Sequence, residues 1–179
     1  MSVYYPGCGT TIPDPQCSDC PDKELGGIRG FFLVKETYSF TDITDIAEWQ
    51  TAITNKDVYL YPKSRGTLEQ TETESQGFGD QSTVVDGYDF VLGVFEPNFV
   101  DNVDHWNAMK RANNYKVGWR TETKLYMSDN AAGIIPKAPV VEDLKIPVLW
   151  NIMFKFNQED YPTPYDIPST LFDQCIAVA

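Results

Sequence analysis

The fold of this chain is decided by the run Thr67-Leu68-Glu69-Gln70-Thr71-Glu72-Thr73-Glu74-Ser75. Its alternating side chains predict an extended strand, but neither face of that strand is apolar. A strand with two polar faces buries little surface and has a weakly specified register. It therefore needs a partner surface or remains a loose loop, and this favours a subunit of an assembly over an isolated enzyme.

The segments around this run predict a β-rich chain with two helices. The strict alternation over 115–127 predicts one long strand with one buried and one wet face. Residues 28–35 are apolar on both faces, which predicts a central strand. Thr41 and Asp42 are suitable N-cap residues for the first helix. In chain order we expect strands over 28–35 and 57–61, a polar hairpin or loop over 63–83, and strands over 84–95, 115–127 and 146–156, with helices over 44–54 and 101–112.

These elements predict an α+β, β-rich fold, namely an antiparallel β-sandwich or barrel with two helices. The length of 179 residues fits a single domain. Within it we expect a Cys- and Pro-rich N-terminal arm over 1–27, a β-rich core over 28–156 and a Pro-rich C-terminal arm over 157–179. Both arms are expected to be extended.

The chain is acidic, with 14 Lys and Arg residues against 26 Asp and Glu residues and a net charge of −12. Nucleic-acid binding depends on basic patches, so we expect no specific nucleic-acid partner. An acidic surface can still lie beside DNA and repel it. Acidity is also an ordinary way for a protein to stay in solution.

The sequence predicts neither export nor a membrane partner. The first residues lack the charged and apolar regions of a signal peptide. The longest apolar run, 147–156, is interrupted by Asn151 and Lys155, which argues against a membrane span. We therefore expect synthesis in the cytoplasm.

Four cysteines give the sharpest local signal, because Cys17 and Cys20 form a CxxC pair. Tetrahedral zinc takes four soft ligands, and a CxxC turn supplies two at once. One interpretation is a structural zinc site that joins the two arms. The other is a set of free thiols, or a disulfide under oxidising conditions. A redox CxxC is disfavoured because no thioredoxin-like βαβ pattern surrounds it. The zinc ligands would be Cys8, Cys17, Cys20 and Cys175.

No established catalytic motif occurs, whether GxSxG, HExxH, a Walker A loop or GxGxxG. His105 is the only histidine, and its position off the apolar stripe indicates a partly exposed helix residue rather than a base. The tryptophans fall on faces assigned to the core, not on a carbohydrate platform. We therefore expect no enzymatic activity and no catalytic residue, with a carbohydrate-binding module as the distant alternative.

Three segments, taken in order, carry a family pattern. A polar hairpin over 66–80 precedes Tyr88-Asp89-Phe90-Val91-Leu92, a Pro97-Asn98 turn leads to Trp106-Asn107-Ala108-Met109, and Tyr115-Lys116-Val117-Gly118-Trp119-Arg120-Thr121 follows. This order resembles tail-tube-type proteins of tailed phages over residues 58–156, as a pattern and not as a specific motif. With its Cys-rich start and Pro-rich end, the whole chain also resembles virion structural proteins of phages from gut bacteria.

In the tail-tube family two sheets form a small barrel flanked by a helix, and a long hairpin reaches the neighbouring subunit. The resemblance implies a non-enzymatic virion subunit, made in the host cytoplasm, that forms homo-oligomers and contacts other virion proteins while DNA passes by. An auxiliary or decoration protein on the capsid is the alternative. The termini and the polar strand are expected to contact other subunits, the latter through Thr67, Glu69, Thr71, Glu72, Thr73 and Glu74.

Overall fold

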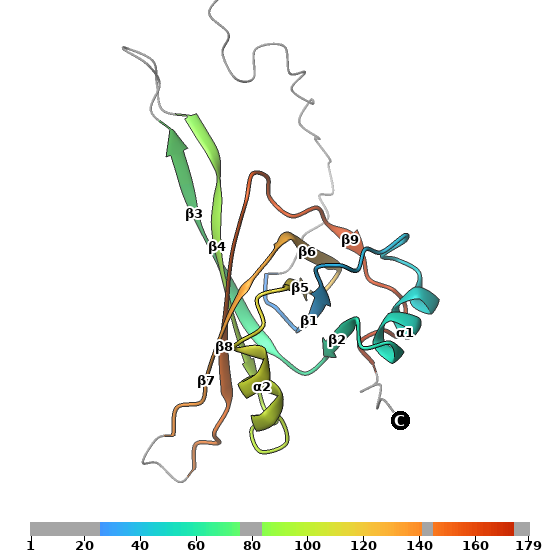
Figure 1. Cartoon of the computed structure of the whole chain (residues 1–179), viewed down its shortest axis with the longest axis vertical. Coiled ribbons are helices and arrows are strands. Elements are labelled where there is room, and N and C mark those ends of the chain that lie inside the picture. The colour runs from blue at the N-terminus through green and yellow to red at the C-terminus, as the bar shows by residue number, and fades with distance from the viewer. Residues whose placement is uncertain (1–25, 76–83, 141–144, 174–179) are drawn as a thin grey trace, which may run out of the picture.

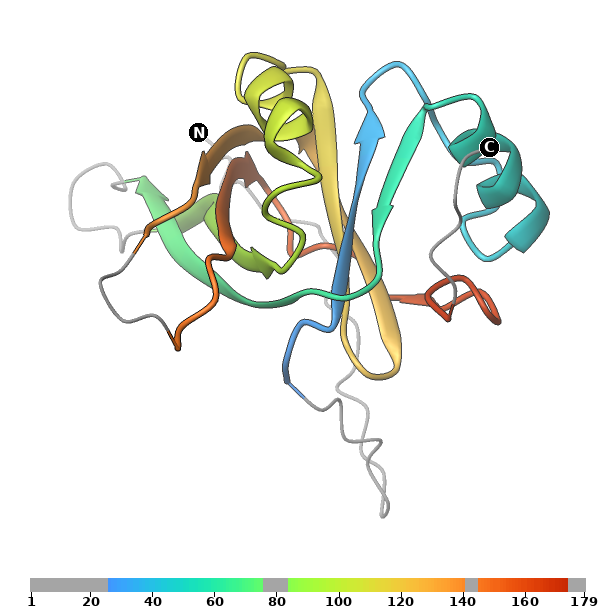
Figure 2. The same cartoon turned by 90° about the horizontal axis from the view of Figure 1, so that it is seen from below.

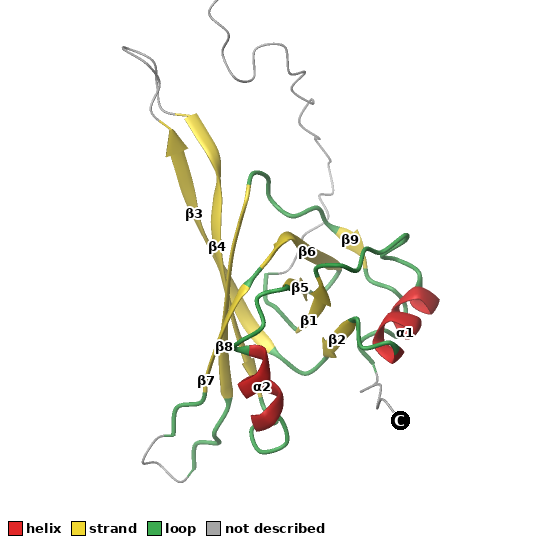
Figure 3. Ribbon diagram, viewed as in Figure 1, coloured by secondary structure: helices red, strands yellow, loops and turns green. Residues whose placement is uncertain are grey.

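The computed structural model describes residues 26–75, 84–140 and 145–173. In these residues two antiparallel sheets pack face to face, as Figure 1 and the perpendicular view in Figure 2 show. Two helices flank the sheets (Figure 3). This architecture confirms the predicted α+β, β-rich sandwich with two helices.

One sheet contains β1 (Gly30–Lys35), β2 (Val58–Tyr61), β5 (Tyr115–Arg120), β6 (Lys124–Ala131) and β9 (Tyr165–Asp166). Its spatial order is β2-β1-β5-β6-β9. The other sheet contains β3 (Arg65–Ser75), β4 (Val84–Glu96), β7 (Gly133–Lys137) and β8 (Trp150–Gln158). Its order is β3-β4-β8-β7, so β3 is an edge strand. The helices are α1 (Ile46–Thr54) and α2 (Val103–Met109).

The chain passes directly from one sheet to the other at two corners. The bend at 62–64 joins β2 to β3, and Ala132 alone separates β6 from β7. A β-bridge between Ile28 and Gly66 adds a link at the first corner. Strands that switch sheets in this way make the corners of two packed sheets. The sandwich is therefore barrel-like along these two sides.

The main core lies between the sheets and is rich in aromatic side chains. Phe31 of β1 is fully buried and stacks on Tyr61 with ring centroids 4.3 Å apart. It also contacts Phe154 of β8 across the sandwich. Trp106 and Met109 of α2 pack into the same cluster. The short helix thus covers one end of this core, although it spans fewer residues than the expected 101–112.

A second core lies on the outer face of the five-stranded sheet. Phe32 of β1 points to this side and meets Trp49 of α1 edge to face at 4.9 Å. Leu171 and Phe172 of the C-terminal segment are buried in the same cluster. Both faces of β1 are therefore covered, as its apolar sequence predicted. The C-terminal segment up to residue 173 folds against this sheet, while 1–25 and 174–179 lie outside the described residues.

The prediction of one strand over 115–127 is wrong, because the chain reverses at Thr121 and forms the β5–β6 hairpin. The Thr121 backbone N–H donates to the Lys124 carbonyl at 2.9 Å, and its hydroxyl accepts from the Lys124 N–H at 3.2 Å. The apolar alternation continues through this turn, so the pattern does not mark it. Trp119 consequently faces the inter-sheet core, whereas Leu125 faces the outer one.

The expected N-cap of α1 is also wrong. Asp45 caps this helix and accepts a hydrogen bond from the Ala47 N–H at 2.9 Å. The backbone N–H groups of Thr41 and Asp42 instead donate to the Glu48 carboxylate, at 2.7 and 2.8 Å. Glu48 therefore fixes the loop that leads into the helix.

We expect Gly118→Ala to destabilise the fold by about 3 kcal/mol, near the upper end of the range for overpacked cores. A Cβ at this position would lie 2.0 Å from Cζ of the buried Phe32 ring. Gly93→Ala in β4 is the matched control, because the nearest atom to its new Cβ is the Thr67 hydroxyl at 3.9 Å. Urea unfolding of both variants measures the difference, and equal stabilities would contradict the packing described here.

Candidate assembly surface

The six residues predicted to contact other subunits all lie on β3 and all have exposed side chains. The antiparallel pairing of β3 with β4 forms one long hairpin, in which Leu68 faces Leu92. Leu68 packs against the inter-sheet core, so it anchors the base of β3. The six residues are Thr67, Glu69, Thr71, Glu72, Thr73 and Glu74.

The hairpin extends beyond the sheet that supports it. The pairing of β4 with β8 begins at Tyr88, so 84–87 and their partners on β3 are paired only with each other among the described residues. Figure 1 shows this two-stranded part projecting away from the body of the protein. A two-stranded ribbon is marginally stable on its own. Its outward-facing backbone groups on β3 are available to another strand or surface.

The hairpin is also strongly acidic. Residues 66–96 contain seven Asp and Glu residues and no Lys, Arg or His. We define the acidic arm as residues 69–75 and 84–89, in which all the described carboxylates are exposed. The arm has five carboxylates and no cationic side chain among its described residues, so a cationic partner would lower its electrostatic energy. These carboxylates are Glu69, Glu72, Glu74, Asp86 and Asp89.

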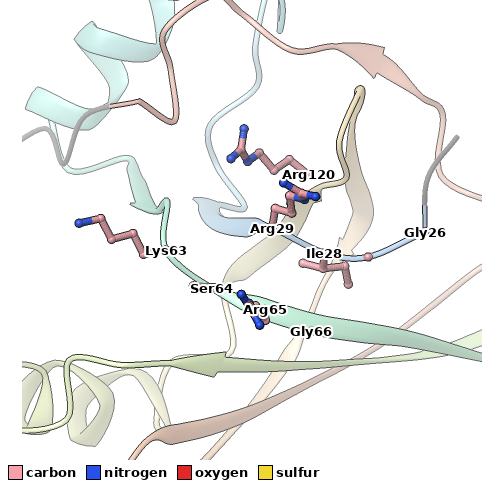
Figure 4. A pocket seen from close by; sticks show the side chains of 9 residues that line it. Gly26, Ile28, Arg29, Lys63, Ser64, Arg65, Gly66 and Arg120 are labelled. Carbon is pink, nitrogen blue, oxygen red and sulfur yellow. The ribbon is translucent and has the colours of Figure 1, made fainter.

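A pocket of opposite charge lies at the base of β3 (Figure 4). Its volume is about 630 Å³, and no carboxylate lines it. We define the basic pocket by its four cationic residues, which come from the segment before β1, the β2–β3 corner, the start of β3 and the end of β5. Gly26, Gly27, Ile28, Ser64 and Gly66 complete its wall. The four cationic residues are Arg29, Lys63, Arg65 and Arg120.

Only one of these four cations has an ion pair within the described part of the chain. Arg29 Nε lies 2.7 Å from Glu122 Oε2. The Arg120 guanidinium lies over the Phe172 ring, 4.7 Å from its centroid, and its buried Nε has no hydrogen-bond partner among the described residues. The pocket therefore retains positive charge that no ion pair within the described residues neutralises. This charge favours an anionic ligand.

Sequence reasoning missed this pocket. Lys63 and Arg65 both come directly before the polar run 67–75, and this pair of cations was the signal in the sequence that could have indicated the pocket. Arg29 and Arg120 are far apart in the sequence, and they meet because the Arg29 N–H donates to the Arg120 carbonyl at 3.0 Å. That pairing follows from the β1–β5 register, which composition does not reveal.

A smaller cleft, of about 340 Å³, lies between β2 and α2 and holds His105. His105 is half-buried, as predicted, and its Nε2 is hydrogen-bonded to the Tyr61 hydroxyl. Burial raises the pKa of Tyr61 well above its usual value, so this hydroxyl is neutral. The nearby Glu96 is buried and accepts from the Asn98 N–H at 3.0 Å and from Trp106 Nε1 at 3.5 Å. Glu96 therefore ties the β4–α2 connection together, which is a structural role.

Burial lowers the pKa of His105, and the Glu96 carboxylate only partly opposes this effect. The unfolded chain, with a histidine pKa near 6.5, then binds the proton more tightly than the folded protein does. We expect the contribution of neutral His105 to the free energy of unfolding to be fully present above about pH 6.5. This contribution should be lost as the pH falls toward the lower folded-state pKa. Thermal unfolding at pH 7.5 and 5.5 measures this loss.

His105→Gln, which can still accept from Tyr61, is the control for this pH dependence and should show a smaller difference between the two pH values. An equal difference in both proteins would assign the pH dependence to other groups.

The proposed zinc ligands Cys8, Cys17, Cys20 and Cys175 all lie outside the described residues. Within the described ranges, no group of His, Cys, Asp or Glu side chains is placed to hold a metal ion. The tryptophans are buried, which confirms their assignment to the core. They are Trp49, Trp106, Trp119 and Trp150.

Comparisons with known proteins give no relative. No family model matches the chain, and no curated protein or solved structure matches it significantly. None of the helices in the described part of the chain has the length and apolar character needed to cross a membrane.

Proposed function

We propose that this chain is a non-enzymatic structural subunit of a phage virion that assembles with copies of itself through the acidic arm, most like a tail-tube-type protein. The observation that carries the proposal is the arm itself: an edge strand, polar on both faces, that projects beyond its own sheet. Such a strand buries little apolar surface and so contributes little to the stability of a monomer. Contact with another molecule would bury its exposed edge and pair its free backbone groups.

Contact between copies would satisfy the exposed edge of β3. Long exposed strand edges invite pairing with other chains, and monomeric proteins usually shorten, bend or cover them. Here β3 runs for 11 residues, and beyond the bridge at Gly66 its outer edge is uncovered by any described strand. Repeating one such contact around an axis generates a closed ring or an open filament.

The fold and the charge of the chain fit this role. A two-sheet, barrel-like core flanked by helices agrees with the architecture that the tail-tube resemblance implies. A net charge of −12 would repel DNA from a channel wall formed by such subunits and so permit DNA to slide past. The proposal therefore includes other virion proteins as partners and DNA only as a passing neighbour.

To test assembly, residues 73–87 are replaced by a two-residue Asn-Gly turn. This change removes the projecting ribbon but keeps the Glu72–Tyr88 pair and the whole β4–β8 pairing. We expect the wild type to form rings, tubes or defined oligomers as its concentration rises, whereas the shortened variant stays monomeric. Light scattering with negative-stain imaging measures both.

Near-ultraviolet circular dichroism and the melting temperature show whether the shortened variant remains folded. Unchanged assembly by a folded shortened variant would contradict the role of the arm. A wild type that remains monomeric at every concentration would contradict self-assembly. Two-, three- or five-fold clusters without stacking would favour a capsid decoration protein over a tube subunit.

A further inference from the structure

We propose that the basic pocket of one copy receives the acidic arm of the next copy. This inference rests on the proposed function and names the surface that the arm contacts. It is drawn from two described features of opposite charge on the same chain. The acidic arm attracts cationic groups, and the basic pocket attracts anionic groups.

The pocket suits carboxylates better than it suits a neutral ligand. Four of the 14 Lys and Arg residues of the chain gather around it, although the net charge is −12. Lys63 and Arg65 are exposed and have no ion pair among the described residues. The Arg120 side chain adds a planar donor whose buried Nε lacks a hydrogen-bond partner within the described ranges. Arginine favours carboxylates because its parallel N–H groups match their two oxygens.

An arm cannot reach the pocket of its own chain. Arg65 in the pocket and Glu74 near the end of the arm lie at opposite ends of the same strand, β3, whose pairing with β4 is continuous up to a bulge at Thr73 and Glu74. At about 3.3 Å per residue they are separated by about 30 Å. Positive and negative charge therefore lie at opposite ends of β3. The arm can satisfy a basic pocket only on a different copy.

A contact of this kind is head-to-tail. Each copy offers one arm and one pocket, so two copies that join still leave one arm and one pocket free. Contacts of this type close into a ring or continue as a helical filament, and they do not stop at a symmetric dimer. The pocket thus gives the proposed assembly a direction along β3.

Charge reversal tests the pairing. The pocket-reversed variant carries Lys63→Glu and Arg65→Glu, and the arm-reversed variant carries Glu72→Lys and Glu74→Lys. All four side chains are exposed, so the fold should survive. We expect each variant alone to need a protein concentration at least about tenfold higher than the wild type for half-assembly, as for a tenfold loss in affinity.

Two further samples bring the reversed arm and the reversed pocket together. In an equal mixture of the two variants, the unchanged acidic arm of one variant meets the unchanged basic pocket of the other. At the remaining contact the two introduced lysines of the arm meet the two introduced glutamates of the pocket, so the mixture should co-assemble. The fourfold variant that carries all four reversals should assemble alone. The matched control is Lys110→Glu with Arg111→Glu, an exposed pair outside the pocket with the same change in net charge. This control should assemble like the wild type.

Sedimentation velocity on these samples, in 0.05 M and 1 M salt, separates the outcomes. Loss of assembly in each single variant, with recovery in the mixture and in the fourfold variant, supports the pairing. Wild-type-like assembly of the pocket-reversed variant would overturn the role of the pocket. If the shortened variant still fails to assemble in that case, the arm remains the assembly element and the proposed function stands. Loss without recovery would overturn the pairing and assign the pocket to another acidic partner. A wild type that never assembles contradicts both proposals.

Discussion

The structure depends on one constraint: β1 is apolar on both faces and must be covered on both. Phe31 and Leu33 point into the space between the sheets, and Phe32 and Val34 point toward α1 and the C-terminal segment. Burial of large apolar side chains on both sides supplies a stabilisation of about 2 kcal/mol per residue before the entropic cost of folding. The five-stranded sheet therefore becomes the middle layer of the protein.

β3 differs from β1 in that neither of its faces is apolar, so neither face has to be covered. It is polar on both faces, so no layer can cover it without leaving polar groups unpaired, and it lies at an edge where only Gly66 and Leu68 approach the core. Its base is fixed by the sheet corner, and its distal half is free to contact a neighbour. Arg65 at its first position and Lys63 just before it carry positive charge where the strand leaves the core, and its carboxylates lie where it leaves the sheet. Position in the fold and charge along the strand thus favour the same function.

The sequence predicted the elements whose side chains have an unambiguous pattern. The two apolar faces of β1, the inward side chains of β8 and the polar length of β3 each correspond to what the structure contains. The turn at Thr121 could not be predicted, because it lacks Gly, Pro and Asn and the alternation continues through it. The basic pocket also could not be predicted, because Arg29 and Arg120 meet only through the β1–β5 register.

The most direct measurement is amide hydrogen exchange along β3, compared between dilute and concentrated protein. Before assembly, the outward-facing amides of 67–75 are exposed to water and should exchange quickly, while the amides of β1 should exchange slowly at every concentration. We expect assembly to slow exchange along 67–75 and around the basic pocket, and to leave exchange in β1 unchanged. Rapid exchange along 67–75 in assembled particles would mean that this strand does not form the contact between copies.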